Sequence, residues 1–97
     1  MTKRKIKKVL EEKGFSVTND GDNWFISRYT PAGEDWGLYF RELEDIIDYA
    51  EDYDPEDDFN MWIEARKRDK TVPEPAELWQ DQLWKQEILN EIVEEVV

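Results

Sequence analysis

The sequence predicts an α+β fold in which one helix, a three-stranded antiparallel meander and three further helices follow one another (αβββααα). Three observations predict this order. Apolar residues recur at helical spacing near both ends of the chain. Between residues 15 and 40, alternating segments are separated by two short turn-forming stretches, which is typical of strands joined by hairpins. A stretch with two prolines then separates the last two helical segments.

The first helix is predicted over residues 2–13, with Gly14 as a natural stop. Its Lys and Arg residues fall on the solvent side, where they offset part of the acidity of the rest of the chain; a basic binding patch is the alternative interpretation. The opposite face is apolar and should turn towards a core. That face consists of Ile6, Val9 and Leu10.

Three strands are predicted over residues 15–18, 24–29 and 36–40. An Asp-Gly pair marks the first hairpin turn, and residues 30–35 contain the Pro and Gly of the second. Two short connections in succession imply an antiparallel meander. Alternation along these strands and helical spacing further on predict that three tryptophans face the core. They are Trp24, Trp36 and Trp62.

The second helix is predicted over residues 42–53 and the third from residue 55 to about residue 66. Asp54 is a good N-cap for the third helix, because Pro55 follows at the first helical position. Carboxylates fill the first turn of this helix, where the helix dipole favours negative charge. Part of the local acidity therefore has a purely structural explanation.

The last helix is predicted from about residue 76 towards the C-terminus. Trp79 and Trp84 lie roughly 140° apart on a helix, so they cannot both face the centre of one narrow stripe. Either this helix is deeply buried or these side chains and Leu83 form an apolar contact surface, for example with a second copy of the chain. The main stripe consists of Leu78, Ile88, Leu89, Ile92, Val93 and Val96.

The composition indicates a single acidic domain over residues 1–97. Its 39% hydrophobic and 13% aromatic residues are too many for a disordered tail, and the length suffices for one modest core. The formal net charge of −12 opposes direct binding to nucleic acid and to anionic membranes, and it favours basic protein surfaces. No apolar run approaches membrane-spanning length.

The residue types also limit the chemistry. The chain has no His and no Cys, so it lacks the side chains that most often activate nucleophiles or bind zinc. We therefore expect a protein that is not an enzyme and that uses no cofactor. The absence of Cys also fits a reducing compartment, and we predict a cytoplasmic location.

One segment invites a test for metal binding. Residues 52–58 begin like a calcium-binding loop. The template then needs Gly at its sixth position, where Asp57 stands, and Glu at its twelfth, where Ile63 stands. We therefore predict no metal site here and interpret the segment as a helix start.

The acidic stretch is the strongest functional signal. Ten carboxylates lie between residues 42 and 58, and no Lys or Arg interrupts them. Like charges one helical turn apart, such as Asp48 and Asp52, cost about 0.2–0.5 kcal/mol per pair, which a purely solvated surface would usually avoid. Such a row can imitate the phosphates of DNA, although solubility or salt adaptation is the competing interpretation. The predicted contacts are Glu44, Asp45, Asp48, Glu51, Asp52, Asp57 and Asp58.

Three segments resemble a family of small uncharacterised acidic proteins common in phages and mobile elements of Firmicutes. They are TPAGEDW at residues 30–36, YAEDYDPEDDFNMWIEARKR at residues 49–68 and VPEPAELWQDQLWKQEIL at residues 72–89. The PAGED turn and the MWIEAR helix segment carry the resemblance, while Asp58 stands where the family frequently has His. The resemblance implies a mobile-element setting, in which small acidic inhibitors of restriction or CRISPR nucleases are common.

Together these observations predict a non-enzymatic inhibitor of anti-CRISPR or anti-restriction type. It would bind the basic, nucleic-acid-binding surface of a host defence nuclease by imitating DNA, without binding nucleic acid itself. The alternative is an accessory protein-interaction module. Its working surface would be apolar and formed by Trp79, Leu83 and Trp84, through which the chain would form a homodimer.

Overall fold

The computed structural model describes residues 3–68 and 75–97. Within these ranges a helix, three antiparallel strands and three further helices follow one another, which confirms the predicted α+β order. The elements are α1 (Lys3–Glu12), β1 (Ser16–Asn19), β2 (Trp24–Tyr29), β3 (Asp35–Phe40), α2 (Asp45–Asp52), α3 (Pro55–Arg68) and α4 (Pro75–Val96).

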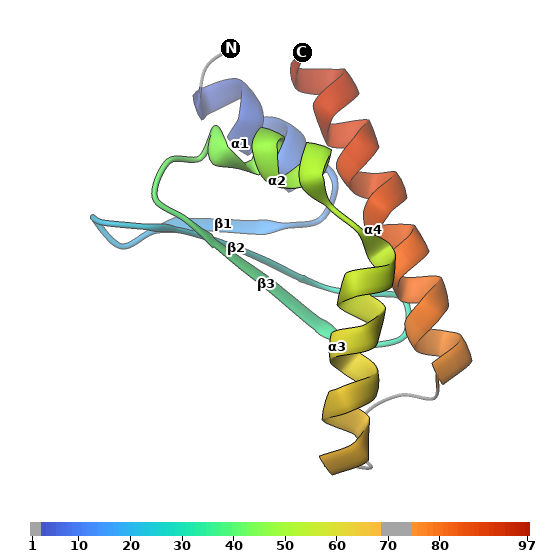
Figure 1. Cartoon of the computed structure of the whole chain (residues 1–97). Helices are drawn as coiled ribbons and strands as arrows, with labels where there is room; N and C mark the ends of the chain where they lie inside the picture. The colour runs from blue at the N-terminus through green and yellow to red at the C-terminus, as the bar shows by residue number, and fades with distance from the viewer. Residues whose placement is uncertain (1–2, 69–74) are drawn as a thin grey trace.

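The three strands form one meander in the order β1-β2-β3. On its inner face Val17 lies opposite Ile26, and Ile26 lies opposite Leu38. Figure 1 shows α1 and α2 above this face of the sheet, with α4 running alongside. Among the described residues no helix covers the outer face, where Tyr29 and Tyr39 are each 70% exposed.

The 22-residue helix α4 is the central support of the fold, because α1, α2 and α3 all lie against it (Figure 1). The inward face predicted for the first helix is confirmed, since Ile6 and Leu10 are fully buried and Val9 nearly so. The completely buried apolar side chains of the core come from the helices, from β2 and from the turn before α2. They are Ile6, Leu10, Ile26, Leu43, Ile46, Leu89 and Ile92.

The first hairpin turn is held by side chains from within it. The Asp20 carboxylate accepts hydrogen bonds from the backbone N–H groups of Asp22 (3.1 Å) and Asn23 (2.8 Å). Gly21 has a φ of 103°, which an L-residue rarely adopts. These backbone bonds hold the pKa of Asp20 below its ordinary value.

Helix α2 begins at Asp45, three residues later than predicted. The preceding residues form a tight turn in which Asp45 N donates to Glu42 O (3.0 Å) and Ile46 N to Leu43 O (3.2 Å). These bonds span three residues rather than four, as in a 3₁₀ turn. Leu43 is completely buried in this turn, so packing of its side chain sets the entry into the helix.

The predicted start of α3 is confirmed. Pro55 is its first residue, and the Asp54 carboxylate accepts a hydrogen bond from the Glu56 N–H (2.9 Å). Tyr53 has an extended backbone with φ −63° and ψ 126°, so α2 ends there and α3 continues in another direction (Figure 1).

The three tryptophans predicted to face the core differ in their surroundings. Trp36 is buried in the core, and Trp24 is half-buried against it. The prediction is wrong for Trp62, which is half-buried outside the apolar core, with the Lys85 ammonium 5.9 Å from its ring centre. No described helix combines the length and apolar character needed to cross a membrane.

Candidate functional site

The first candidate site is an exposed surface on α2. Asp45, Asp48, Glu51 and Asp52 are all exposed, while Ile46 on the opposite side of the helix is completely buried. At 100° per residue the four carboxylates fall within roughly 120° of one another. They therefore share the solvent face of a helix only two turns long.

The surface continues onto α3 across the bend at Tyr53. Asp54, Glu56 and Asp57 are exposed at the start of this helix. Asp52, Asp54 and Asp57 line the same shallow hollow of about 320 Å³, so the carboxylates of the two helices meet there. We call the whole set the anionic face: Asp45, Asp48, Glu51, Asp52, Asp54, Glu56 and Asp57.

None of these seven carboxylates forms an ion pair with a described side chain. The lysines of the described ion pairs are bound to other acids. Lys3 pairs with Glu42 (3.1 Å), Lys13 with two glutamates of α4, Lys67 with Glu64, and Lys85 with two buried carboxylates. The anionic face is therefore not neutralised by the cations of the described part of the chain.

Five of the seven predicted contacts lie on this face, namely Asp45, Asp48, Glu51, Asp52 and Asp57. Glu44 is half-buried at its edge, and its Oε1 has no hydrogen-bond partner in the described part of the chain. Asp58 lines the same hollow but forms an ion pair with Lys85, so we do not count it as part of the face. Asp54 and Glu56 were not among the predicted contacts and extend the face across the bend.

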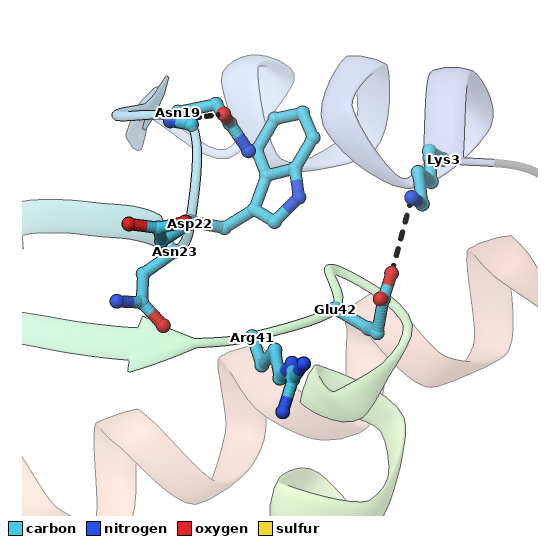
Figure 2. Close-up of a pocket in the computed structure, with 8 residues that line it drawn as sticks. Lys3, Asn19, Asp22, Asn23, Arg41 and Glu42 are labelled. Atoms are coloured by element: carbon cyan, nitrogen blue, oxygen red, sulfur yellow. Dashed lines mark hydrogen bonds and ion pairs between the residues drawn. The ribbon is translucent and has the colours of Figure 1, made fainter.

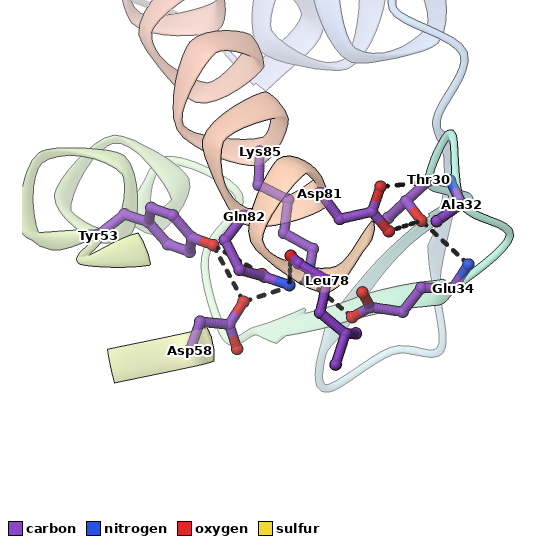
Figure 3. Close-up of polar contacts among 9 residues, drawn as sticks. All are labelled: Thr30, Ala32, Glu34, Tyr53, Asp58, Leu78, Asp81, Gln82 and Lys85. Atoms are coloured by element: carbon purple, nitrogen blue, oxygen red, sulfur yellow. Dashed lines mark hydrogen bonds and ion pairs between the residues drawn. The ribbon is translucent and has the colours of Figure 1, made fainter. Parts of the chain in front are cut away.

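Behind the anionic face lies a buried cluster centred on Lys85 of α4 (Figure 3). Its ammonium donates to Glu34 Oε1 (2.8 Å), just before β3, and to Asp58 Oδ2 (3.1 Å) on α3. The Tyr53 hydroxyl lies 3.0 Å from Asp58 Oδ2 and 3.1 Å from Gln82 Oε1. Three segments distant in the sequence are thus joined at one point of α4.

The same helix holds the turn between β2 and β3. Asp81 accepts hydrogen bonds from the Thr30 hydroxyl and from the Ala32 N–H (3.2 Å). The Thr30 hydroxyl in turn accepts a bond from the Glu34 N–H (3.0 Å), as Figure 3 shows. We call the charged groups Glu34, Asp58, Asp81 and Lys85, with the polar partners Thr30, Tyr53 and Gln82, the buried cluster.

Burial controls the protonation of this cluster. Removal from water raises the pKa of Glu34, and Asp81 and Asp58 raise it further, while Lys85 acts in the opposite direction. Burial also raises the pKa of Tyr53 and of Tyr49, with a further contribution from the charge of Asp58. Both phenols therefore stay neutral at ordinary pH.

The sequence did contain a signal for this cluster. Asp81, Gln82 and Lys85 are buried on α4 at positions that join Leu78 to Ile88 in steps of three or four residues. The predicted apolar stripe therefore omits three polar residues that lie on the same buried face of the helix. Their burial depends on partners from the β2–β3 turn and α3, which no helical pattern reveals.

The apolar contact surface considered for the last helix is largely used within the chain. The Trp79 ring packs edge to face on Phe59, with ring centres 5.3 Å apart. The Trp84 ring packs on Trp36 (5.8 Å), and the Arg28 guanidinium lies 4.6 Å from its centre. Trp79 and Trp84 are half-buried, and Leu83 is 38% exposed.

A hollow of about 560 Å³ lies between the β1–β2 hairpin, the start of α1 and the end of β3. Figure 2 shows the residues that line it. Two cations, Lys3 and Arg41, and two carboxylates, Asp22 and Glu42, line it together with Trp24. Their charges balance, and the bond to Glu42 raises the pKa of Lys3. This hollow therefore offers no net charge to a ligand.

Among the described residues, no three or more carboxylates are arranged to hold a metal ion. No protein-family model, curated protein or solved structure matches the chain. The anionic face and the buried cluster are therefore the features of the molecule from which a function can be inferred.

Proposed function

We propose that this protein is a non-enzymatic binding protein whose anionic face docks on the basic, nucleic-acid-binding surface of another protein. The observation that carries this proposal is the set of seven exposed carboxylates without an ion pair among the described side chains. A basic partner would supply the missing counter-charges.

The positions of the carboxylates on α2 support a role in binding. Local electrostatics explain Glu56 and Asp57, which lie in the first turn of α3, where the helix dipole favours them. They do not explain Glu51 and Asp52, which lie in the last turn of α2, where the dipole disfavours negative charge by about 0.3–1 kcal/mol each. A surface that only needs solubility has no reason to accept this cost.

The charge density supports a nucleic-acid-binding surface as the target. The eight residues of α2 span about 12 Å and carry four exposed carboxylates, or about one per 3 Å. Each strand of duplex DNA carries one phosphate per about 3.4 Å of helix axis. The axial charge density of α2 is therefore close to that of one DNA strand, which supports the proposed imitation. The bend at Tyr53 limits the straight row to this helix.

The target class that we propose is a host defence nuclease, as the resemblance to mobile-element proteins predicts. Such enzymes hold DNA in basic grooves that would accept the anionic face. The cytoplasm is the compartment where this encounter would take place.

The test is a pair of triple variants with equal charge change. Asp48→Asn, Glu51→Gln and Asp52→Asn remove three charges from the anionic face. The control, Glu12→Gln, Glu87→Gln and Glu94→Gln, removes three exposed charges that form no ion pair among the described side chains. Each protein is immobilised, used to capture partners from a bacterial lysate, and tested against purified restriction and CRISPR nucleases for inhibition of DNA cleavage.

We expect wild type and control to capture the same nucleic-acid-binding proteins and to inhibit cleavage. The anionic-face variant should lose at least tenfold in affinity at about 0.1 M salt, together with the steep salt dependence of binding. Equal affinity of the two triple variants would contradict the proposal. Failure of all three proteins to inhibit any nuclease would exclude the nuclease as target while leaving other basic partners open to the capture experiment.

A further inference from the structure

The buried cluster contains more negative than positive charge. Glu34, Asp58 and Asp81 supply three carboxylates, and Lys85 supplies the only ammonium group among its members. The side chains of Glu34 and Lys85 are each 2% exposed, so water cannot screen them. In addition, Glu34 Oε2 is buried without a hydrogen-bond partner among the described residues, although its Oε1 binds Lys85. A buried polar atom without a partner is rare and calls for a physical reason.

Every element around Glu34 contributes a charge or a titratable group. Asp81 and Lys85 face it from α4, and Asp58 faces it from α3. Tyr49 and Tyr53, on the α2 side of the cluster, stay neutral because burial raises the pKa of each phenol. A proton on Glu34 would remove one of the three negative charges and turn one carboxyl oxygen into a hydroxyl group.

Helix α3 is the element that depends most on this cluster. It makes its main packing contacts with α4, and none of its described side chains is fully buried. Among the described residues, its ion pair to the rest of the molecule is the bond from Asp58 to Lys85. In Figure 1, α3 extends away from the sheet beside one end of α4.

We propose that a single proton on Glu34 controls how firmly α3 is docked on α4. With the proton bound, Asp58 forms an ion pair with Lys85, only Asp81 is left without a counter-charge within the cluster, and α3 stays closed. When the proton is lost, the uncompensated charge is relieved by separation of α3, which takes Asp58 away and admits water to Glu34. Because α3 carries part of the anionic face, its opening would change the geometry of that face.

The sign of the effect follows from linkage. The pKa of Glu34 is raised in the closed state, so the closed state binds the proton more tightly than the open state does. The closed state is therefore favoured at low pH, and its advantage is lost as pH rises through the pKa of Glu34 in the closed state. Between the pKa of Glu34 in the open state and its pKa in the closed state, the open population grows by up to about tenfold per pH unit, as expected for one proton.

We call this proton-dependent docking of α3 on α4 the latch. Amide hydrogen exchange on the free, full-length protein tests it without any partner. Opening of α3 is measured at residues 58–64 from about pH 5 to about pH 8, and residues 6–10 of α1 report global unfolding. Wild type should show a one-proton dependence confined to α3. In Glu34→Gln, which keeps the shape and an acceptor for Lys85, this dependence should disappear. The matched control Glu87→Gln alters an exposed carboxylate of α4 and should behave like wild type.

An α3 opening that ignores pH in wild type, or that keeps the wild-type slope in Glu34→Gln, would overturn the latch. Should Glu34→Gln fail to fold, carboxyl NMR on wild type decides. The pKa of Glu34 must then lie above the ordinary value for Glu of about 4.3, and its titration must have the same midpoint as the pH dependence of α3 opening. The latch concerns the free protein, so these readouts stand even where the proposed docking of the anionic face fails.

Discussion

A single buried ammonium group, that of Lys85, joins three separate parts of the chain. It binds Glu34 ahead of β3 and Asp58 on α3 while belonging to α4 itself. A buried ion pair need not stabilise a protein, because the loss of hydration can exceed the attraction. Removal of one partner is a different matter, since it leaves the other charges buried without compensation.

Replacement of this residue should therefore be severe. We expect Lys85→Met to lower the free energy of unfolding by about 3–5 kcal/mol, measured by urea unfolding near pH 7. The matched control is Lys67→Met, because Lys67 pairs with Glu64 at the surface and such pairs contribute at most about 1 kcal/mol.

Restoring charge balance should recover part of the loss. Lys85→Met combined with Glu34→Gln and Asp58→Asn no longer buries two unpaired carboxylates at this point. We expect this triple variant to be more stable than Lys85→Met alone. If Lys85→Met and Lys67→Met cost the same, the cluster has no special role in holding the fold together.

At the scale of elements, local patterns predicted the fold well. The hairpin turns, the Asp54–Pro55 helix start and the inward face of α1 depend on neighbours a few residues apart, and the structure confirms them. The start of α2 was predicted too early. There the burial of Leu43, a tertiary contact, outweighs the helical spacing of the sequence.

In the candidate site, too, the features that depend on near neighbours in the sequence were predictable, and those that depend on tertiary contacts were not. Exposure of Asp48, Glu51 and Asp52 follows from helical spacing and was predictable. The inward turn of Asp58 was not, because its partner Lys85 lies 27 residues further along the chain. Glu34 and Lys85 are 51 residues apart, and only the packing of the β2–β3 turn on α4 brings them together.

Helix α2 offers a stability test of the proposed function. Asp48 and Asp52 repel each other one turn apart, and Glu51 and Asp52 oppose the dipole of the helix. We expect Asp48→Asn, Glu51→Gln and Asp52→Asn together to raise the free energy of unfolding by about 0.5–1.5 kcal/mol, measured by urea unfolding.

The control triple Glu12→Gln, Glu87→Gln and Glu94→Gln changes the net charge equally but removes no charge from α2. Its stabilisation should be smaller. A loss of stability in the α2 variant would instead give these carboxylates a structural role, and the cost argument for binding would fail.

At the scale of the whole molecule, charge is distributed unevenly. The net charge is −12, yet exposed cations gather on α1, where Arg4, Lys7 and Lys8 lie along the solvent side. The anionic face occupies α2 and the start of α3. The molecule therefore carries the two signs of charge on different elements, and such an asymmetric distribution favours some docking orientations over others.

Self-repulsion of this net charge should make the stability of the fold depend on salt. The Debye length falls from about 30 Å at 0.01 M to about 10 Å at 0.1 M and about 3 Å at 1 M, so added NaCl screens repulsion between exposed carboxylates. The buried pair of Lys85 is largely shielded from salt. For a domain of this size, 1 kcal/mol changes Tm by about 4–8 °C.

We therefore expect Tm to rise by several degrees between about 0.01 M and about 0.5 M NaCl, measured by calorimetry near pH 7. The rise should be smaller in the Asp48→Asn, Glu51→Gln, Asp52→Asn variant than in the control triple, because net charge is equal and only its concentration on α2 differs. Equal rises in the two variants would show that repulsion is spread over the whole surface. The carboxylates of the anionic face would then repel one another no more strongly than the carboxylates elsewhere on the surface do.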